Sequence, residues 1–366
     1  MAADHTKPST VSALSTSLIT ADIATAARLL EKGQLVAFPT ETVYGLGADA
    51  ENPSAIARIY RAKGRPSNHP VIVHLAPAAD LAYWVGAIPA QASALIDRFW
   101  PGPLTLILPR AAHIPAAVAG GQNSIGVRCP SHPVAQALLR EFKNGRGGIA
   151  APSANKFGHV SPTTAQHVRD EFGAIGHGVD ADHENLISAI LDGGQSEVGI
   201  ESTILDLTRL DSHGPVLLRP GRISRLELAQ VLGSEPALPV TRDAMAPRAS
   251  GTLDAHYAPR TPLAMISTND LADCLQQLSD SGHRAVLLHW TDLPSTTLTI
   301  ASGLLQLPAT ASGYAHALYA GLRGLDGLDA DVILVEQPPD TAAWQAIHDR
   351  LRRAAFDSVG VLQRLR

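Results

Sequence analysis

The sequence predicts an α/β protein with two domains, and three observations support this prediction. At 366 residues the chain is long for a single hydrophobic core. Segments with helical periodicity alternate with short apolar runs of strand length. A proline-rich stretch with little periodicity then separates the first alternating series from a second one. We therefore expect a flexible leader at 1–20, a first domain at 21–231, a linker at 232–262 and a second domain at 263–366.

The first series predicts a twisted mixed sheet. Periodicity over 21–32 indicates a helix that ends at Gly33, and the apolar run 34–38 indicates a buried strand. Similar patterns predict helices over 53–62, 90–100, 133–142 and 163–171, and strands over 71–75, 104–108, 124–128, 148–151, 189–192 and 203–207. Several of these strands are short, which favours a twisted mixed sheet over a plain doubly wound one.

The second series predicts a small Rossmann-like α/β domain. Its pattern gives strands over 263–267, 284–290 and 330–336, and helices over 269–281, 313–323 and 341–356. A polar Thr/Ser stretch lies between the second strand and the second helix. Neither GxGxxG nor GxxxxGK[ST] occurs in this half. By itself this domain therefore indicates no function.

Composition excludes several classes of protein. With 45% hydrophobic and 17% charged residues, the chain resembles a folded globular protein. The longest apolar region, 81–96, is interrupted by Pro89 and Gln91 and is too short to cross a bilayer. The polar N-terminus does not read as a signal peptide. Cys129 and Cys274 fall in different predicted domains, which argues against a disulfide framework or a Cys-rich zinc site. We expect a cytoplasmic protein with no membrane contact.

The charge is unevenly placed along the chain. The net charge is −5, yet residues 40–160 contain eleven Lys or Arg against six Asp or Glu. A local basic excess on an acidic protein suggests a confined anionic ligand. A solvated face with a chance asymmetry explains the same pattern equally well.

The segment 38–47 is the most informative part of the chain. It reads Phe38-Pro39-Thr40-Glu41-Thr42-Val43-Tyr44-Gly45-Leu46-Gly47 and follows directly from the predicted strand 34–38. We expect a hydroxyl-rich, glycine-rich turn there, which places short polar side chains and bare N–H groups at one rim of the sheet. That rim is where open α/β sheets bind ligands.

Two pairs of residues suit an anionic ligand. Lys63 and Arg65 lie at the end of a predicted helix, where they could bind phosphate oxygens or simply stabilise the helix C-terminus. Ser124 and Arg128 share one face of a predicted strand. Arg128 could bind a substrate carboxylate, or it could be an edge arginine that reaches to water.

Three further polar residues follow the strand 148–151. Ser153, Asn155 and Ser161 could present hydroxyl and amide groups to phosphates or to metal-bound water, although such loops are usually only turns. His74 lies beside an apolar strand, where a histidine is more often a hydrogen-bonded core residue than a ligand-binding one.

The decapeptide at 38–47 resembles the signature of the YrdC-like family, the threonylcarbamoyl-AMP synthases. Further motifs follow in the family's order: Lys63-Gly64-Arg65-Pro66, Trp100-Pro101-Gly102-Pro103-Leu104-Thr105, Val127-Arg128, Ala151-Pro152-Ser153-Ala154-Asn155, Glu201-Ser202-Thr203-Ile204 and Leu218-Arg219-Pro220-Gly221. His256-Tyr257-Ala258-Pro259 matches the longer, two-domain members. The resemblance covers about residues 20 to 260, and it implies a twisted α/β sheet with a central concave pocket.

The resemblance also implies roles for individual residues. The residues implied to bind threonine are Thr42, His74, Arg128, Ala151 and Ser202. Those implied to bind ATP are Lys63, Arg65, His69, Ser124, Ser153, Asn155, Ser161, Arg219, Gly251 and Tyr257. Lys63 and Arg65 would form the catalytic phosphate clamp, and Mg²⁺ would bind together with ATP. The chain departs from the family at two places. His69 replaces an asparagine, and the stretch 250–259 lacks the family's basic, aromatic middle, although the linker is expected to fold over the pocket as a lid.

The implied reaction joins L-threonine, CO₂ from bicarbonate and ATP into threonylcarbamoyl-AMP and pyrophosphate. A partner transferase would then use this product to modify adenosine 37 of tRNA, and a weak contact with tRNA is possible. Three alternative hypotheses for the function are a double-stranded RNA or tRNA-binding module, a carbamoyl transferase of the hydrogenase-maturation type and a regulator with a vestigial pocket. The small number of cysteines argues against the second of these.

Overall fold

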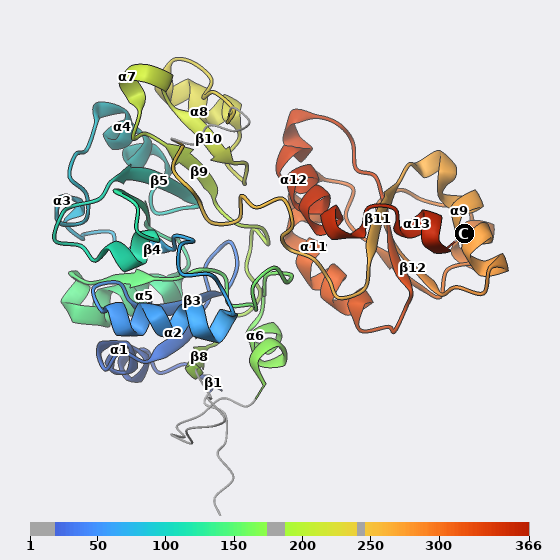
Figure 1. Ribbon diagram of the computed structural model, residues 1–366, viewed down its shortest axis with the longest axis horizontal. Coiled ribbons are helices and arrows are strands. Elements are labelled where there is room, and N and C mark those ends of the chain that lie inside the picture. The colour runs from blue at the N-terminus through green and yellow to red at the C-terminus, as the bar shows by residue number, and fades with distance from the viewer. Residues whose placement is uncertain (1–18, 174–186, 240–245, 366) are drawn as a thin grey trace, which may run out of the picture.

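The computed structural model describes residues 19–173, 187–239 and 246–365, which form two α/β units that lie side by side (Figure 1). The first contains a ten-stranded mixed sheet in the order β1-β8-β2-β3-β7-β4-β6-β5-β9-β10. The second contains a four-stranded sheet in the order β11-β14-β12-β13, and all of its strand pairs are parallel. The predicted two-domain α/β class and the mixed first sheet are confirmed. The finer likeness to a Rossmann domain and the exact domain limits stay predictions.

The strands of the first sheet are β1 (Ile19–Thr20), β2 (Leu35–Phe38), β3 (Gly45–Asp49), β4 (Ile72–Leu75), β5 (Leu104–Pro109), β6 (Ser124–Arg128), β7 (Gly148–Ala150), β8 (Ile187–Leu191), β9 (Thr203–Asp206) and β10 (Val216–Arg219). The α-helices of this unit are α1 (Ile23–Glu31), α2 (Pro53–Lys63), α3 (Leu81–Trp84), α4 (Ala90–Phe99), α5 (Pro133–Glu141), α6 (Ala165–Phe172), α7 (Leu210–His213) and α8 (Arg225–Leu232). Every helix and strand predicted for this part of the chain is present, to within a few residues at its ends.

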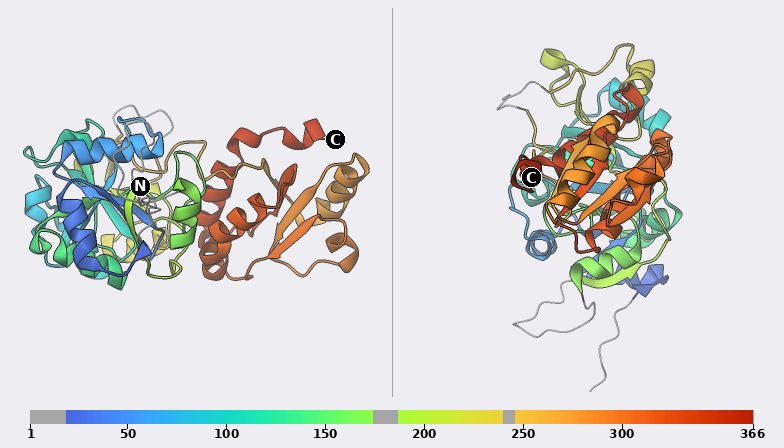
Figure 2. Two further views of the ribbon diagram at one scale, coloured as in Figure 1. Left: turned by 90° about the horizontal axis from the view of Figure 1, so that it is seen from below. Right: turned by 90° about the vertical axis from the view of Figure 1, so that its right-hand side faces the viewer.

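The second unit is built from β11 (Leu263–Ile266), α9 (Leu271–Asp280), β12 (Ala285–His289), α10 (Ser295–Leu298), β13 (Gly303–Gln306), α11 (Ala311–Asp326), β14 (Val332–Glu336), α12 (Gln345–Ala354) and α13 (Val361–Leu365). Helices α11 and α12 lie on the side of the sheet that faces the first unit, whereas α9 and α13 lie on the far side (Figures 1 and 2). Among the helices of the described residues, none is long and apolar enough to cross a membrane.

Capping residues explain where helix α2 begins and ends. Asn52 accepts hydrogen bonds from the backbone N–H groups of Ser54 and Ala55, and Pro53 occupies the first turn, where its missing N–H costs nothing. Gly64 ends the helix in the left-handed conformation, at φ +63°. The chain therefore leaves α2 sharply, and it places Lys63 and Arg65 on either side of this turn.

The structure corrects the prediction of a glycine-rich turn after β2. Gly45 to Asp49 form β3, which pairs antiparallel with β2, so only the residues between the two strands make the turn. A Cβ on Gly47 would lie 2.9 Å from both Ile149 Cγ2 and Phe38 Cε1. Glycine is needed here because neighbouring side chains press on the strand, and the missing apolar pattern hid the strand from the sequence.

Other elements were also missed. Ile19 and Thr20, expected in the leader, form β1 beside β8, and the rest of the predicted leader lies outside the described residues. Strand β10 and helix α8 were not predicted, nor was β13, which occupies the polar stretch after β12. Strand β13 is half exposed along its length, so it lacks a continuous apolar run.

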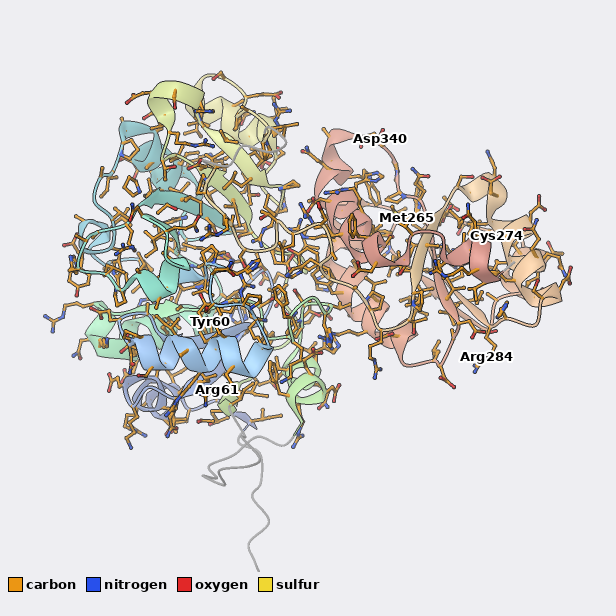
Figure 3. All side chains as sticks on the ribbon, in the orientation of Figure 1. Tyr60, Arg61, Met265, Cys274, Arg284 and Asp340 are labelled. Carbon is orange, nitrogen blue, oxygen red and sulfur yellow. The ribbon has the colours of Figure 1, made fainter. Side chains whose placement is uncertain are left out.

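The two units share part of one hydrophobic core. Val43, Val160 and Ile200 of the first unit belong to the same buried cluster as Tyr314 and Tyr319 of α11. Side chains from both units accordingly fill the space between them (Figure 3). This shared core places the second unit directly against the segments that carry polar motifs of the first.

Candidate functional site

One pocket gathers residues from distant parts of the chain. Its lining comprises Thr40, Thr42, Val43, Gly45, Ile72, His74, Arg128, Ala151, Pro152, Ser153, Glu201, Ser202, Arg219, Ser250, Gly251, His256 and Tyr257. All five residues predicted to contact threonine are among them. Of the ten predicted ATP contacts, Ser153, Arg219, Gly251 and Tyr257 line the same pocket.

The threonine set is positioned by neighbouring strands. Strands β4 and β6 run parallel, and their register places His74 opposite Arg128. Arg128 donates from Nη1 to the Thr42 hydroxyl at 2.9 Å and from Nε to the Gly102 carbonyl at 3.2 Å. These bonds hold the guanidinium in one orientation, so this part of the pocket is already arranged in the structure.

Glu41, to which the sequence analysis assigns no role, lies directly beside Arg128. Its Oε1 lies 2.8 Å from Arg128 Nη2, and both side chains are almost fully buried. The contact is a charge pair without an aligned hydrogen bond, since Arg128 Nη2 and both Glu41 oxygens lack hydrogen-bond partners within the described part of the chain. Arg128 Nη2 therefore keeps a hydrogen bond to offer to a bound carboxylate.

His74 is neutral in this environment. Burial, and then the nearby charge of Arg128, lower its pKa to about 3. Among the described residues its Nδ1 has no hydrogen-bond partner. A buried polar atom without a partner is costly, so this nitrogen is suited to a hydrogen bond with a ligand.

Arg219 joins three segments around the pocket. It donates to the Ser202 carbonyl at 3.0 Å, to the Ser202 hydroxyl at 3.1 Å and to the Ser250 carbonyl at 2.9 Å. The Ser202 hydroxyl also contacts the Thr105 hydroxyl at 2.8 Å. Burial lowers the pKa of Arg219, although an arginine keeps its charge at neutral pH. The site thus holds a fixed cation next to the linker.

The proposed clamp residues do not line the pocket in this conformation. Lys63 Nζ donates to the Ser153 carbonyl at 2.6 Å and to the Asn155 carbonyl. Arg65 donates to the Pro70 carbonyl at 2.9 Å and reaches the Ser250 hydroxyl at 3.4 Å. Burial, followed by the neighbouring Arg65, lowers the pKa of Lys63, and burial lowers that of Arg65 to about 10. Both cations lie directly behind the pocket wall, and their role stays a prediction.

The other predicted ATP contacts are spread around this wall. Ser124 lines a second pocket that shares Ile72 and Ser250 with the first. The Ser161 hydroxyl donates to Glu201 at 2.5 Å. Asn155 donates to the Lys156 and His159 carbonyls, while its Oδ1 has no partner in the described ranges. His69 packs against the Phe157 ring outside both pockets.

The linker crosses the pocket, with residues 240–245 of the predicted linker outside the described residues. Gly251 has φ +72°, and a Cβ there would collide with the Tyr257 hydroxyl and lie 2.8 Å from Arg219 Nη1. Tyr257 also has a positive φ, +63°, and its hydroxyl donates to the Gly251 carbonyl at 3.4 Å. Despite its altered middle, the linker therefore lines the pocket and packs tightly on Arg219, and its role as a lid stays a prediction.

Comparisons with known proteins agree with this arrangement. Residues 28–221 match the family model for Sua5, YciO and YrdC described as "Telomere recombination", and residues 223–356 match "Threonylcarbamoyl-AMP synthase, C-terminal domain". A threonylcarbamoyl-AMP synthase of Bacillus subtilis is 40% identical over 343 residues, which cover 91% of this chain and 92% of the relative. One of Pyrococcus abyssi is 35% identical, covering 91% and 94%. The chain belongs to the threonylcarbamoyl-AMP synthase family.

A solved structure of the threonylcarbamoyl-AMP synthase family shows the same two-domain fold. The crystal structure of P. abyssi Sua5 complexed with L-threonine superposes with a TM-score of 0.80 at 35% identity, covering 91% of this chain and 94% of that one. The resemblance drawn from the sequence motifs is confirmed. The similarity extends through the second domain, whose sequence patterns alone indicate no function.

Proposed function

We propose that this chain forms threonylcarbamoyl-AMP and pyrophosphate from L-threonine, CO₂ derived from bicarbonate, and ATP. The observation that carries the proposal is one pocket in which Arg128 and Arg219 lie beside hydroxyl groups from several segments. The side chains of Arg128, Arg219 and Ser202 are buried, so a small molecule can reach them in the pocket but the backbone of a nucleic acid duplex cannot. The rival RNA-binding function therefore finds no support in this pocket.

L-Threonine would bind at the end formed by β4 and β6. Arg128 would hold its carboxylate through the hydrogen-bonding capacity left on Nη2, and Glu41 would offset the arginine charge when the site is empty. Neutral His74 and the Ser202 hydroxyl would hydrogen-bond the remaining polar groups of the amino acid. Thr42 would act mainly by orienting Arg128, to which it is hydrogen-bonded at 2.9 Å.

ATP would bind at the other end, under the linker. Its phosphates would lie near Arg219, Ser153 and Gly251, with Ser124 contacting the nucleotide in the adjoining pocket. Among the described residues, no group of three His, Cys, Asp or Glu could hold a metal ion, so Mg²⁺ would be carried by the phosphates themselves. The unpartnered Asn155 Oδ1 suits a water molecule bound to that ion.

The chemistry follows from placing these two ligands side by side. The threonine amine adds to CO₂ and loses a proton, which gives a carbamate. A carbamate oxygen then forms a bond to the α-phosphorus of ATP while the bond to the bridging oxygen breaks, and pyrophosphate leaves with that electron pair. The fixed cations offset the charge on the phosphates. The linker keeps water from the labile carbamate. A tRNA threonylcarbamoyl transferase would consume the product.

A pyrophosphate-release assay tests this function. We expect release only when ATP, Mg²⁺, L-threonine and bicarbonate are all present, and omission of any one should return the rate to background. Release that is equally fast without threonine, or without bicarbonate, would refute the proposed reaction.

A further inference from the structure

One carboxylate in the pocket wall is held by the C-terminal domain. Glu201 lines the pocket and is 6% exposed. Its Oε2 accepts hydrogen bonds from Arg350 Nε at 2.8 Å and from the Tyr319 hydroxyl at 2.9 Å, while its Oε1 accepts from Ser161 at 2.5 Å. Arg350 belongs to α12 and Tyr319 to α11, so the C-terminal domain supplies two of these three donors.

Arg350 also contacts the linker. Its guanidinium carbon lies 5.2 Å from the centre of the Tyr257 ring, a distance at which a cation and an aromatic face attract. The Tyr257 ring in turn stacks on that of Tyr319, with their centres 5.7 Å apart. Arg350 is 1% exposed, and its remaining charge partner is Asp349 at 2.8 Å. The buried Arg350 thus contacts both Glu201 in the pocket wall and Tyr257 of the linker.

The charge of Arg350 helps to set the protonation state of Glu201 and the net charge at this part of the pocket wall. Burial alone would raise the pKa of Glu201, but Arg350, Arg219 and the hydrogen bond from Ser161 together outweigh burial and lower the pKa to about 2, with Arg350 the largest of the lowering causes. Glu201 is therefore ionised. Without Arg350 it would face the anionic phosphates of ATP as a buried charge that has lost its principal cation. Paired with Arg350, it can anchor Ser161 without repelling them.

We propose that Arg350 is a positioning residue through which the C-terminal domain prepares the nucleotide end of the site, by neutralising and orienting Glu201. This inference rests on the proposed binding of ATP in the pocket. It gives the C-terminal domain a defined task in the reaction that a role in stability alone would not include. The effect should fall on ATP rather than on threonine, because Ser161, which Glu201 anchors, and Arg219, whose charge acts on Glu201, are the residues assigned to the nucleotide.

The test compares Arg350→Met, Glu201→Gln and the double variant in the full-length protein. The control is Arg352→Met, because Arg352 lies on the same helix with its side chain 55% exposed. ATP and threonine affinities are measured separately by calorimetry, and KM values by pyrophosphate release. We expect Arg350→Met to weaken ATP binding about tenfold or more, as removal of a buried charge partner does, while threonine binding changes less than about twofold. The double variant should bind ATP within about threefold of Glu201→Gln.

The outcomes separate this inference from the proposed function. Restoration of ATP affinity in the double variant would support action through Glu201, because a merely structural loss would not be rescued. An unchanged ATP affinity in Arg350→Met, or a double variant as weak as Arg350→Met, would overturn the inference. If Arg350→Met does not fold, the comparison of the double variant with Glu201→Gln decides in the same way. Wild-type protein that binds ATP but releases no pyrophosphate would instead count against the proposed reaction.

Discussion

The two ends of the pocket are built differently. The threonine end stands on paired strands, where Arg128 is already oriented by Thr42 and by the Gly102 carbonyl. The nucleotide end is built from a helix terminus, loops and the linker, and its cations Lys63 and Arg65 donate to backbone carbonyls instead of lining the pocket. With the ligands placed as we propose, threonine would meet a preformed site, whereas ATP would bind side chains that must first leave their present hydrogen bonds.

This difference predicts an order of events. Threonine should bind to the free protein with little rearrangement, because side chains on strands of a sheet are held rigidly. ATP should bind with rearrangement of the linker and of the Lys63 turn, since their donors are already engaged. Substitutions at the two ends should therefore separate cleanly into effects on threonine and effects on ATP.

The largest effect is expected at Arg65. Arg65→Ala should abolish pyrophosphate release without unfolding the chain, because it removes a cation that we propose to bind the phosphates of ATP. Arg61→Ala, at an exposed position in the last turn of α2, is the control. A fully active Arg65→Ala protein would refute the clamp assignment. A loss of threonine binding in the same variant would show that the two ends do not act independently.

The next effect is expected at the threonine end. Arg128→Lys should weaken threonine binding by roughly 100-fold, about 3 kcal/mol, because an ammonium cannot reproduce the planar fork that binds a carboxylate. ATP affinity measured without threonine should change by less than about threefold. Calorimetry with each ligand alone provides both values, and Arg98→Lys on the exposed face of α4 serves as the matched control. Equal losses for both ligands would show that the two ends are not independent.

A smaller effect is expected in the linker. Gly251→Ala adds a Cβ that collides with the Tyr257 hydroxyl and strains a positive φ. The rate of pyrophosphate release should fall about tenfold, with threonine affinity nearly unchanged. Gly282→Ala is a close control, because it shares a positive φ of +79° but meets nothing within 4 Å. If both variants lose the same activity, backbone strain and not closure of the linker would be responsible.

The smallest effect concerns stability in acid. Burial lowers the pKa of His74 to about 3, so between about pH 6.5 and 3 the unfolded chain binds a proton that the native chain excludes. Stability should therefore fall as the pH falls below 6.5, by about 1.4 kcal/mol per pH unit for such a group. Urea unfolding at pH 7 and pH 5 should show a smaller pH dependence in His74→Gln than in the wild type. An identical dependence in both proteins would contradict the burial of a neutral His74.

The strand-borne part of the site could be predicted from the sequence because local patterns carry it. The apolar run 71–75 and the alternating run 124–128 define β4 and β6, and period two then aligns Arg128 with its neighbours. Strand β3 was missed by the same method, because its glycines show no apolar alternation. Gly47 is glycine because a Cβ there would lie too close to Phe38 and Ile149.

The remaining parts of the site depend on contacts that no local pattern encodes. Glu201 meets Tyr319 and Arg350 across 118 and 149 residues of sequence. The turning of Lys63 toward the Ser153 carbonyl likewise depends on where a distant loop passes. A motif can identify such residues as important, but only the packed structure shows which atoms they hold.

A crystal structure with L-threonine, Mg²⁺ and a non-hydrolysable ATP analogue would show whether one pocket binds both substrates. We expect threonine to bind with its carboxylate hydrogen-bonded to Arg128, next to Ser202. The phosphates of the analogue should lie against Arg219 and Ser153, with the linker closed over both ligands. A nucleotide bound on an outer surface, or threonine bound away from Arg128, would contradict the claim that this one pocket brings the two substrates together.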